Sequence, residues 1–474
     1  MKCMHGRIDG PPRTIGGQES NRHAARRGCG PRVLLLTSGL GCGHVRALDA
    51  LAAALAERAP EATVRRLDFW SLMNPGIAAS VQQMYLELVQ GSPDLYDRLH
   101  RLDQRTWRRI LENDVEPPPE VRELAERILA NGFGGDLFGS ALGPYPTDLV
   151  FYPTACATLP STERRGLGSF ALPRLAMLKW AWTRLQGRLE RQLDAFGPDV
   201  VVSTQMVPAA LLSAVKLDRG LALPSIGVLT DFGVHDYWVQ PGTDLYCVPD
   251  ASMIDAPFDS ARTGSVIATG IPLMPGFAHP PSPAESRAML GLDPGCPVVL
   301  VLGGGLGLGV DGIASRLLDA LPGVQLVAMT GQNAAARTAM ARRATRQDPR
   351  LVVCDWTERM EAYLSAADLV VGKAGGLTVG EALACGRPLV VAKSLRGQEG
   401  FNVDFLERHD VGRLVDEATL AGQVAAWLSD PDALARRQAR ALELGRCDGA
   451  DRVARLALEC AAGRTTLTTG WGEW

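Results

Sequence analysis

The sequence repeats one unit three times: a short apolar run, a glycine-rich turn and a segment with helical spacing. The first apolar run, 32–37, is continuous rather than alternating, which is typical of a strand buried on both faces of a parallel sheet. Glycine-rich turns follow such runs at 39–43, 303–309 and 372–378. Because a further strand is expected at 63–68, the first unit reads as βαβ, and the chain is predicted to have an α/β fold with doubly wound sheets.

Strands and helices alternate along both halves of the chain. The predicted strands are 32–37, 63–68, 199–203, 225–230, 244–248, 298–302, 324–329, 351–354, 369–371 and 389–391. The predicted helices are 45–58, 77–109, one near 119–130, 170–196 and 427–460. A proline-rich stretch at 271–283 separates the halves, because such stretches are stiff and extended. The predicted organisation is a disordered extension at 1–30, a first domain at 31–275 with an insertion at 112–170, a second domain at 276–462 and a tail at 463–474.

Composition excludes several classes of protein. The 474 residues carry 49 Lys and Arg against 52 Asp and Glu, a net charge of −3, whereas a nucleic-acid-binding domain is basic. The ten cysteines include no CxxC pair, so no zinc knuckle is indicated and a reducing cytoplasm is expected. The start of the chain lacks the apolar segment of a secretory signal, and no run of roughly 18 apolar residues predicts a membrane-spanning helix.

The glycine-rich turns are candidate phosphate sites. Glycine lets a backbone approach a ligand closely, and the helix that follows offers unpaired N–H groups and the positive end of its dipole. The alternative is that each is only a tight turn between a strand and a helix. The turns match neither the P-loop spacing nor the GxGxxG spacing, which disfavours a nicotinamide-dependent oxidoreductase.

Three polar clusters after predicted strands are candidate binding sites. Thr378 and Glu381 have the spacing of a capping box, so Glu381 either caps the helix or accepts hydrogen bonds from a ribose diol. The run 396–402 is either a surface loop or a group of amides and carboxylates that holds sugar hydroxyls. The segment 230–238 collects carboxylates, an imidazole and aromatic rings at a strand end, which favours a functional site.

Together these segments resemble the family of monogalactosyldiacylglycerol synthases and processive diacylglycerol glucosyltransferases, which is related to the peptidoglycan enzyme that adds N-acetylglucosamine to lipid I. The most specific match is the run KAGGLTVGEALA at 373–384, followed by Pro388, Gly397-Gln398-Glu399 and Asn402. The central motif of the family is similar to Thr230-Asp231, His235 and Trp238, and the first glycine-rich turn ends in His44. The resemblance covers roughly 32–110 and 197–415.

The resemblance implies a GT-B fold, in which two Rossmann-like doubly wound domains face each other across a cleft. It also implies transfer of a hexose with inversion at the anomeric carbon. The second domain would hold UDP-glucose or UDP-galactose as co-substrate, with no cofactor and no metal, and the first would bind a lipid acceptor such as diacylglycerol. The donor-binding residues implied are Gly305, Gly307, Gln332, Asn333, Gly375, Gly376, Thr378, Glu381, Gln398, Glu399 and Asn402. His235 and Trp238 would contact the acceptor.

Inverting transfer needs a general base that takes the proton of the acceptor hydroxyl. His44 is the first candidate, because the dipole at a helix N-terminus disfavours the charged imidazole and keeps it able to accept a proton. Asp231 is the second, either as the base or as the residue that orients it.

Two questions stay open at this stage. The basic amphipathic helix 170–196 and the stretch 77–109 either dock on an anionic membrane surface, at the inner face of the cell membrane, or pack in the core with a solvated charged face. The alternatives to a lipid-directed enzyme are a GT-B enzyme with a soluble small-molecule acceptor and a sugar-nucleotide-binding protein without turnover. No nucleic-acid partner is expected.

Overall fold

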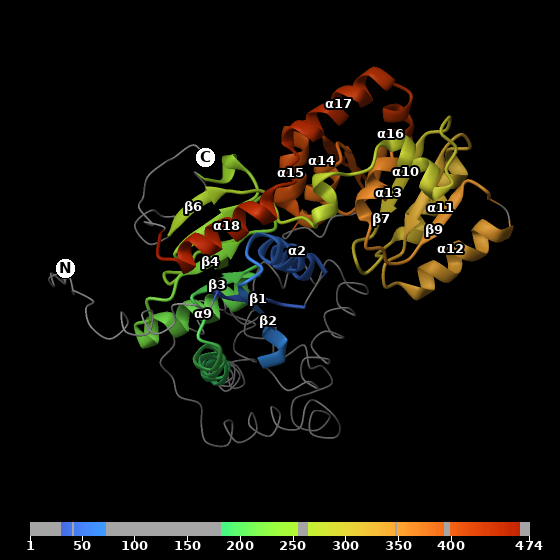
Figure 1. The fold of residues 1–474 in the computed structure, drawn as a ribbon. Helices are drawn as coiled ribbons and strands as arrows, with labels where there is room; N and C mark the ends of the chain where they lie inside the picture. Colours follow the sequence, from blue (N-terminus) through green and yellow to red (C-terminus); the bar gives the residue numbers. More distant parts are fainter. Residues whose placement is uncertain are drawn as a thin grey trace, which may run out of the picture.

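A computed structural model describes residues 30–39, 42–72, 182–254, 264–346, 348–392 and 399–464. These residues form two six-stranded sheets, ordered β2-β1-β3-β4-β5-β6 and β12-β11-β10-β7-β8-β9. Neighbouring strands pair in parallel throughout both sheets. Figure 1 shows the sheets in two separate domains, each with helices packed around it. The predicted α/β fold with two Rossmann-like doubly wound domains is confirmed.

The first domain is built on six strands and three helices of the described residues. Its strands are β1 (Arg32–Thr37), β2 (Thr63–Asp68), β3 (Val200–Ser203), β4 (Ser225–Val228), β5 (Leu245–Val248) and β6 (Ser265–Ala268). Its helices are α2 (Cys42–Arg58), a helix over 182–196 and α9 (Met206–Arg219).

The second domain alternates strands and helices in the same way. Its strands are β7 (Val298–Leu302), β8 (Gln325–Met329), β9 (Leu351–Cys354), β10 (Leu369–Gly372), β11 (Leu389–Val391) and β12 (Gly412–Leu414). Its helices are α10 (Pro283–Leu290), α11 (Val310–Ala320), α12 (Ala334–Arg346), α13 (Met360–Ala366), α14 (Gly376–Ala384), α15 (Gly400–Arg408), α16 (Leu420–Leu428) and α17 (Pro431–Leu444).

Strand β1 shows why its apolar run is continuous. Val33 and Leu35 belong to a buried cluster with α2, whereas Leu34 and Leu36 belong to a second cluster with α9 and the helix over 182–196. Side chains of a strand alternate between the two faces of the sheet, so a strand covered on both faces needs apolar residues at every position. The strand predictions therefore hold to within one or two residues.

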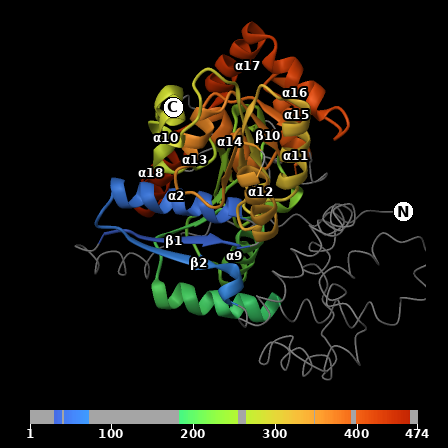
Figure 2. The same cartoon turned by 90° about the vertical axis from the view of Figure 1, so that its right-hand side faces the viewer.

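Helix α18 (Gly449–Ala461) lies in the range assigned to the second domain but packs on the first. Its apolar face, which includes Val453 and Leu456, joins the same buried cluster as α2 and β3. Figure 1 shows this red helix beside the blue and green domain, and Figure 2 shows it next to α2. The segment predicted to be helical over 427–460 contains the end of α16, followed by α17 and α18. Pro431 begins α17, and residues 445–448 separate α17 from α18.

Two strands were not predicted. β6 and β12 are edge strands of their sheets, and they are only four and three residues long, with partly exposed residues. Several predictions lie outside the described residues: the extension at 1–30 except its last residue, the helix at 77–109, the insertion at 112–170 with its helix, and the tail from 465 onward.

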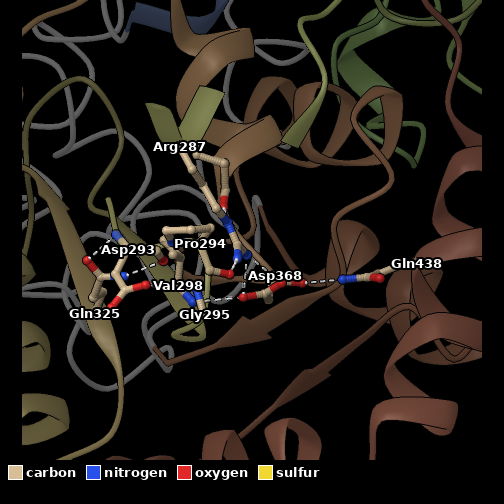
Figure 3. A network of polar contacts seen from close by, with 9 residues as sticks. Arg287, Asp293, Pro294, Gly295, Val298, Gln325, Asp368 and Gln438 are labelled. Carbon is tan, nitrogen blue, oxygen red and sulfur yellow. Dashed lines mark hydrogen bonds and ion pairs between the residues drawn. The ribbon is translucent and has the colours of Figure 1, made fainter. Parts of the chain in front are cut away.

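The amino ends of the second sheet are fixed by a polar network (Figure 3). Arg287 on α10 places Nη2 2.8 Å from both carboxylate oxygens of Asp368, which also accepts a 2.7 Å bond from the backbone N–H of Val298. Gln438 on α17 donates to the backbone oxygen of Asp368 at 2.9 Å. Because these contacts lie where β7 and β10 begin, the opposite, carboxyl ends of the strands remain available for a ligand.

Candidate active site

A cavity of about 220 Å³ lies between the two domains, at the carboxyl ends of parallel strands. In the second sheet the strand order reverses at β7 and β10, and the glycine-rich turns after both strands line the cavity. Open α/β sheets bind ligands where the strand order reverses, because loops and helix N-termini converge there. The charged and polar lining side chains are His44 and Arg46 from α2, Thr230 and Asp231 from the loop after β4, and Asp355, Thr357, Lys373, Thr378, Glu381 and Glu399 from the second domain.

His44 lies in the first turn of α2 and lines the cavity. Its Nδ1 is 2.9 Å from the backbone oxygen of Thr204 and 3.2 Å from Oγ1 of Thr230. Because a carbonyl oxygen only accepts, Nδ1 carries the proton of the neutral ring and Nε2 is its basic nitrogen. Burial lowers the pKa of His44 to about 4, and the bond to Thr204 opposes this only in part. His44 is therefore neutral near pH 7 and able to accept a proton.

Asp231 enters the same cavity from the loop after β4. Burial raises the pKa of its carboxyl group, while hydrogen bonds from Asn402 and from the backbone of Gly376, and the positive charge of Lys373, act in the opposite direction. Both predicted bases thus stand on the first domain and face the second.

Three of the predicted phosphate-contacting glycines, Gly305, Gly375 and Gly376, line the cavity. Gly307 lies behind them with φ +60°, where a Cβ would be 1.9 Å from the backbone oxygen of Thr330. Glycine also allows the two domains to pack closely here, since a Cβ on Gly305 would lie 2.2 Å from Sγ of Cys42 on α2. These turns are therefore more than strand-to-helix connections, because they form one wall of an interdomain cavity.

Glu381 and Thr378 both line the cavity, and they do not form a capping box. Helix α14 begins at Gly376 with Gly375 as its N-cap and no side-chain cap bond, so Thr378 already lies inside the helix. The capping interpretation of Glu381 is wrong, because the glycine pair starts the helix earlier than Thr378 would. Burial, reinforced by the charge of Glu361, raises the pKa of Glu381 to about 8, although Arg46 lowers it.

Two cations of the cavity were missed at the sequence level. Lys373 forms a 2.9 Å ion pair with Glu399, and both side chains are nearly buried. Arg46 of α2 crosses to the second domain, where it pairs with Glu358 at 3.1 Å and lies 5.7 Å from the ring centre of Trp356. Lys373 was visible as the first residue of the 373–384 motif. Arg46 follows His44 by two positions, and only the position of α2 at the cavity reveals it.

Some predicted site residues lie outside the cavity lining. Asn333 caps α12 through a 2.9 Å bond from the backbone of Ala336, and Gln332 donates its backbone N–H to Gly305. Trp238 is 6% exposed and packs within the first domain, while His235 accepts a bond from the backbone of Tyr237. Asn402 is buried at the domain interface, and Gln398 lies outside the described residues.

Two profiles of known protein families match the chain. The profile of monogalactosyldiacylglycerol (MGDG) synthase matches residues 172–273, and that of the glycosyltransferase family 28 C-terminal domain matches residues 298–453. A processive diacylglycerol beta-glucosyltransferase of Bacillus subtilis (strain 168) is 27% identical over 253 residues, which are 52% of this chain and 65% of that protein. The enzyme of the same name from Bacillus cereus (strain B4264) is 25% identical over 301 residues, which are 62% of this chain and 77% of that protein.

Among solved structures, MurG of Acinetobacter baumannii superposes with a TM-score of 0.54 at 15% identity, covering 90% of this chain and 99% of MurG. That likeness supports the fold. The alignment to the Bacillus subtilis enzyme spans less than two thirds of its length. The two profiles, the curated relatives and the shared fold confirm the predicted resemblance: the chain has a GT-B fold and is similar in sequence to the monogalactosyldiacylglycerol synthases and processive diacylglycerol glucosyltransferases.

Proposed function

We propose that the chain is an inverting hexosyltransferase that moves a sugar from a UDP-sugar to a lipid acceptor such as diacylglycerol. The observation that carries this proposal is the interdomain cavity, in which His44 of the first domain faces the glycine turns and Glu381 of the second. The names of the curated relatives favour glucose as the sugar and diacylglycerol as the acceptor.

The proposed mechanism assigns one task to each side of the cavity. Nε2 of His44 takes the proton of the acceptor hydroxyl, whose oxygen forms a bond to the anomeric carbon from the face opposite the leaving group. The bond between that carbon and the phosphate oxygen breaks, and UDP departs with the electron pair. Backbone N–H groups at the start of α14, with the charges of Lys373 and Arg46, stabilise the departing diphosphate. Glu381 accepts the ribose hydroxyls.

A donor and acceptor screen by UDP release tests the proposal. UDP-glucose and UDP-galactose are each offered with diacylglycerol in mixed micelles or with small phenols. Release that depends on diacylglycerol supports the lipid acceptor, and release that depends only on phenols identifies a soluble acceptor. UDP binding without release under any condition identifies a sugar-nucleotide-binding protein.

We further propose that the protein acts at a membrane surface bearing anionic lipid. None of the helices in the described part of the chain is long and apolar enough to cross a bilayer. The helix over 182–196 turns its apolar side, including Trp182 and Leu189, into the core of the first domain, so only its charged side is available to lipid. Cosedimentation with anionic and zwitterionic vesicles tests the proposal, and equal recovery with both would contradict it.

A further inference from the structure

One buried amide joins the two domains beside the cavity. Asn402 on α15 is 0% exposed, and its side chain makes three hydrogen bonds. Its Oδ1 accepts from the backbone N–H of Phe232 at 2.7 Å, and its Nδ2 donates to Oδ1 of Asp231 at 2.9 Å and to the backbone oxygen of Ala374 at 2.8 Å. Asp231 and Phe232 belong to the first domain and Ala374 to the second, so this side chain fixes their relative position.

The surrounding contacts leave the loop after β4 little freedom. A Cβ on Gly376 would lie 1.8 Å from the backbone oxygen of Thr230, and a Cβ on Gly233 would lie 2.1 Å from Cγ of Phe401. The rings of Phe232 and Phe405 stack with centres 4.2 Å apart. The carboxylate of Asp231 therefore reaches the cavity from a loop that rests on the starts of α14 and α15.

The titratable groups around Asp231 come from both domains. Lys373, which is paired with Glu399, stands on the second domain, and His44 reaches Thr230 from α2. Burial raises the pKa of Asp231, whereas the bond from Asn402, the backbone of Gly376 and the charge of Lys373 lower it. Removing the amide of Asn402 would leave a buried carboxylate without one of its donors, which favours the protonated form.

We propose that Asn402 is a positioning residue, which holds the carboxylate of Asp231 in the cavity only when the two domains are closed. This inference rests on the proposed function, and it differs from the donor-contacting role that the family resemblance implies for Asn402. Within the part of the chain that the structure describes, Asn402 is not among the residues that line the cavity. Asp231 and His44 line the same cavity, so a carboxylate held there would stabilise the imidazolium that forms when His44 takes the acceptor proton, and transfer would depend on closure.

The test compares Asn402→Ala and Asn402→Asp with the wild-type chain. For both variants we expect an affinity for UDP within about three-fold of wild type and a kcat at least ten-fold lower. We also expect the acid limb of the pH profile of kcat/KM to move to higher pH. The shift should be larger for Asn402→Asp, because a second carboxylate beside Asp231 disfavours its ionised form. An unchanged acid limb, or a raised KM for the UDP-sugar with normal kcat, would overturn the proposal, and the second result would return Asn402 to the donor site.

Ser282→Ala is the control for lost stability. Ser282 forms the capping box of α10 with Glu285 and is not among the residues that line the cavity, so its loss should lower thermal stability without moving the acid limb. Small-angle scattering of the unliganded full chain gives a readout that needs no turnover. Asn402→Ala should increase the radius of gyration and Ser282→Ala should not, and an unchanged radius in Asn402→Ala would count against a role of Asn402 in holding the two domains together. Failure of the wild-type chain to bind UDP would instead contradict the proposed function. The scattering comparison would remain valid in that case.

Discussion

At the scale of single residues, the tautomer of His44 decides what the ring can do. The bond to the carbonyl oxygen of Thr204 fixes the proton on Nδ1, and burial keeps the ring neutral at pH 7. A neutral base that is already held in the reactive tautomer needs little free energy for reorganisation when it accepts a proton. Replacing it should therefore affect the chemical step far more than the binding of UDP.

The variant His44→Ala is expected to lower kcat by about 10²- to 10⁴-fold, the usual range for a lost general base. Its affinity for UDP, measured by titration calorimetry, should stay close to that of wild type. His279→Ala, at an exposed position after the first domain, is the matched control and should keep full activity. Near-normal turnover in His44→Ala would transfer the role of base to Asp231.

The pKa of Glu381 predicts how UDP binding depends on pH. With a pKa of about 8, Glu381 is protonated at pH 7 in the free protein, and it must lose that proton to accept two ribose hydroxyls as a carboxylate. Affinity for UDP should thus rise by at least about ten-fold between roughly pH 6.5 and 8.5. Below the pKa, the ionised fraction of Glu381 falls about ten-fold for each pH unit. Glu381→Gln should bind weakly at all pH values, and a wild-type affinity that does not change with pH would exclude this role.

At the scale of elements, the start of α14 packs tightly against the first domain, because a Cβ on Gly376 would lie 1.8 Å from the backbone oxygen of Thr230. Gly376→Ala is expected to lower kcat/KM by at least ten-fold, because the new methyl group would overlap the backbone oxygen of Thr230 and push the domains apart. Gly312→Ala is the matched control, since it lies within α11 with open space around it and should gain roughly 0.5–1 kcal/mol in stability. Steady-state kinetics and thermal unfolding of both variants provide the measurement. Full activity in Gly376→Ala would show that the close contact is not needed.

The strands and helices also show how much of the fold could be predicted from the sequence. Strands covered on both faces, such as β1 and β7, were predicted almost to the residue, because burial on both faces demands an unbroken apolar run. β6 and β12 were missed, because a short strand with partly exposed residues needs no such run. The placement of α18 was also missed, since an amphipathic pattern reveals that a helix has an apolar face but not which sheet it covers.

The same reasoning applies to the candidate site. His44, Glu381 and three of the predicted glycines line the cavity, and each was predicted in a segment that follows a predicted strand. Trp238 was expected in the acceptor site but packs inside the first domain, because a buried aromatic residue near a strand end gives the same local pattern as a ligand-binding one. Arg46 and the bridging role of Asn402 depend on contacts between the two domains, which no local pattern contains.

At the scale of the whole molecule, a ligand in the cavity should couple the stability of both domains. UDP at about 100 times its Kd stabilises a protein that binds it only when folded by about 2.7 kcal/mol. Because both domains line the cavity, calorimetric unfolding with UDP should shift the transitions of both to higher temperature. A shift confined to one transition would show that the ligand contacts one domain alone.

Helix α18 has a consequence for how the chain is made. The first domain is completed by a helix that begins at Gly449, roughly 180 residues after the last strand of its sheet ends at Ala268. At ordinary rates of translation these residues take roughly 10 to 40 s to synthesise. Throughout that interval the apolar surface of α2 that α18 will cover faces water on the ribosome, so the nascent first domain should require protection by a chaperone until the second domain has emerged.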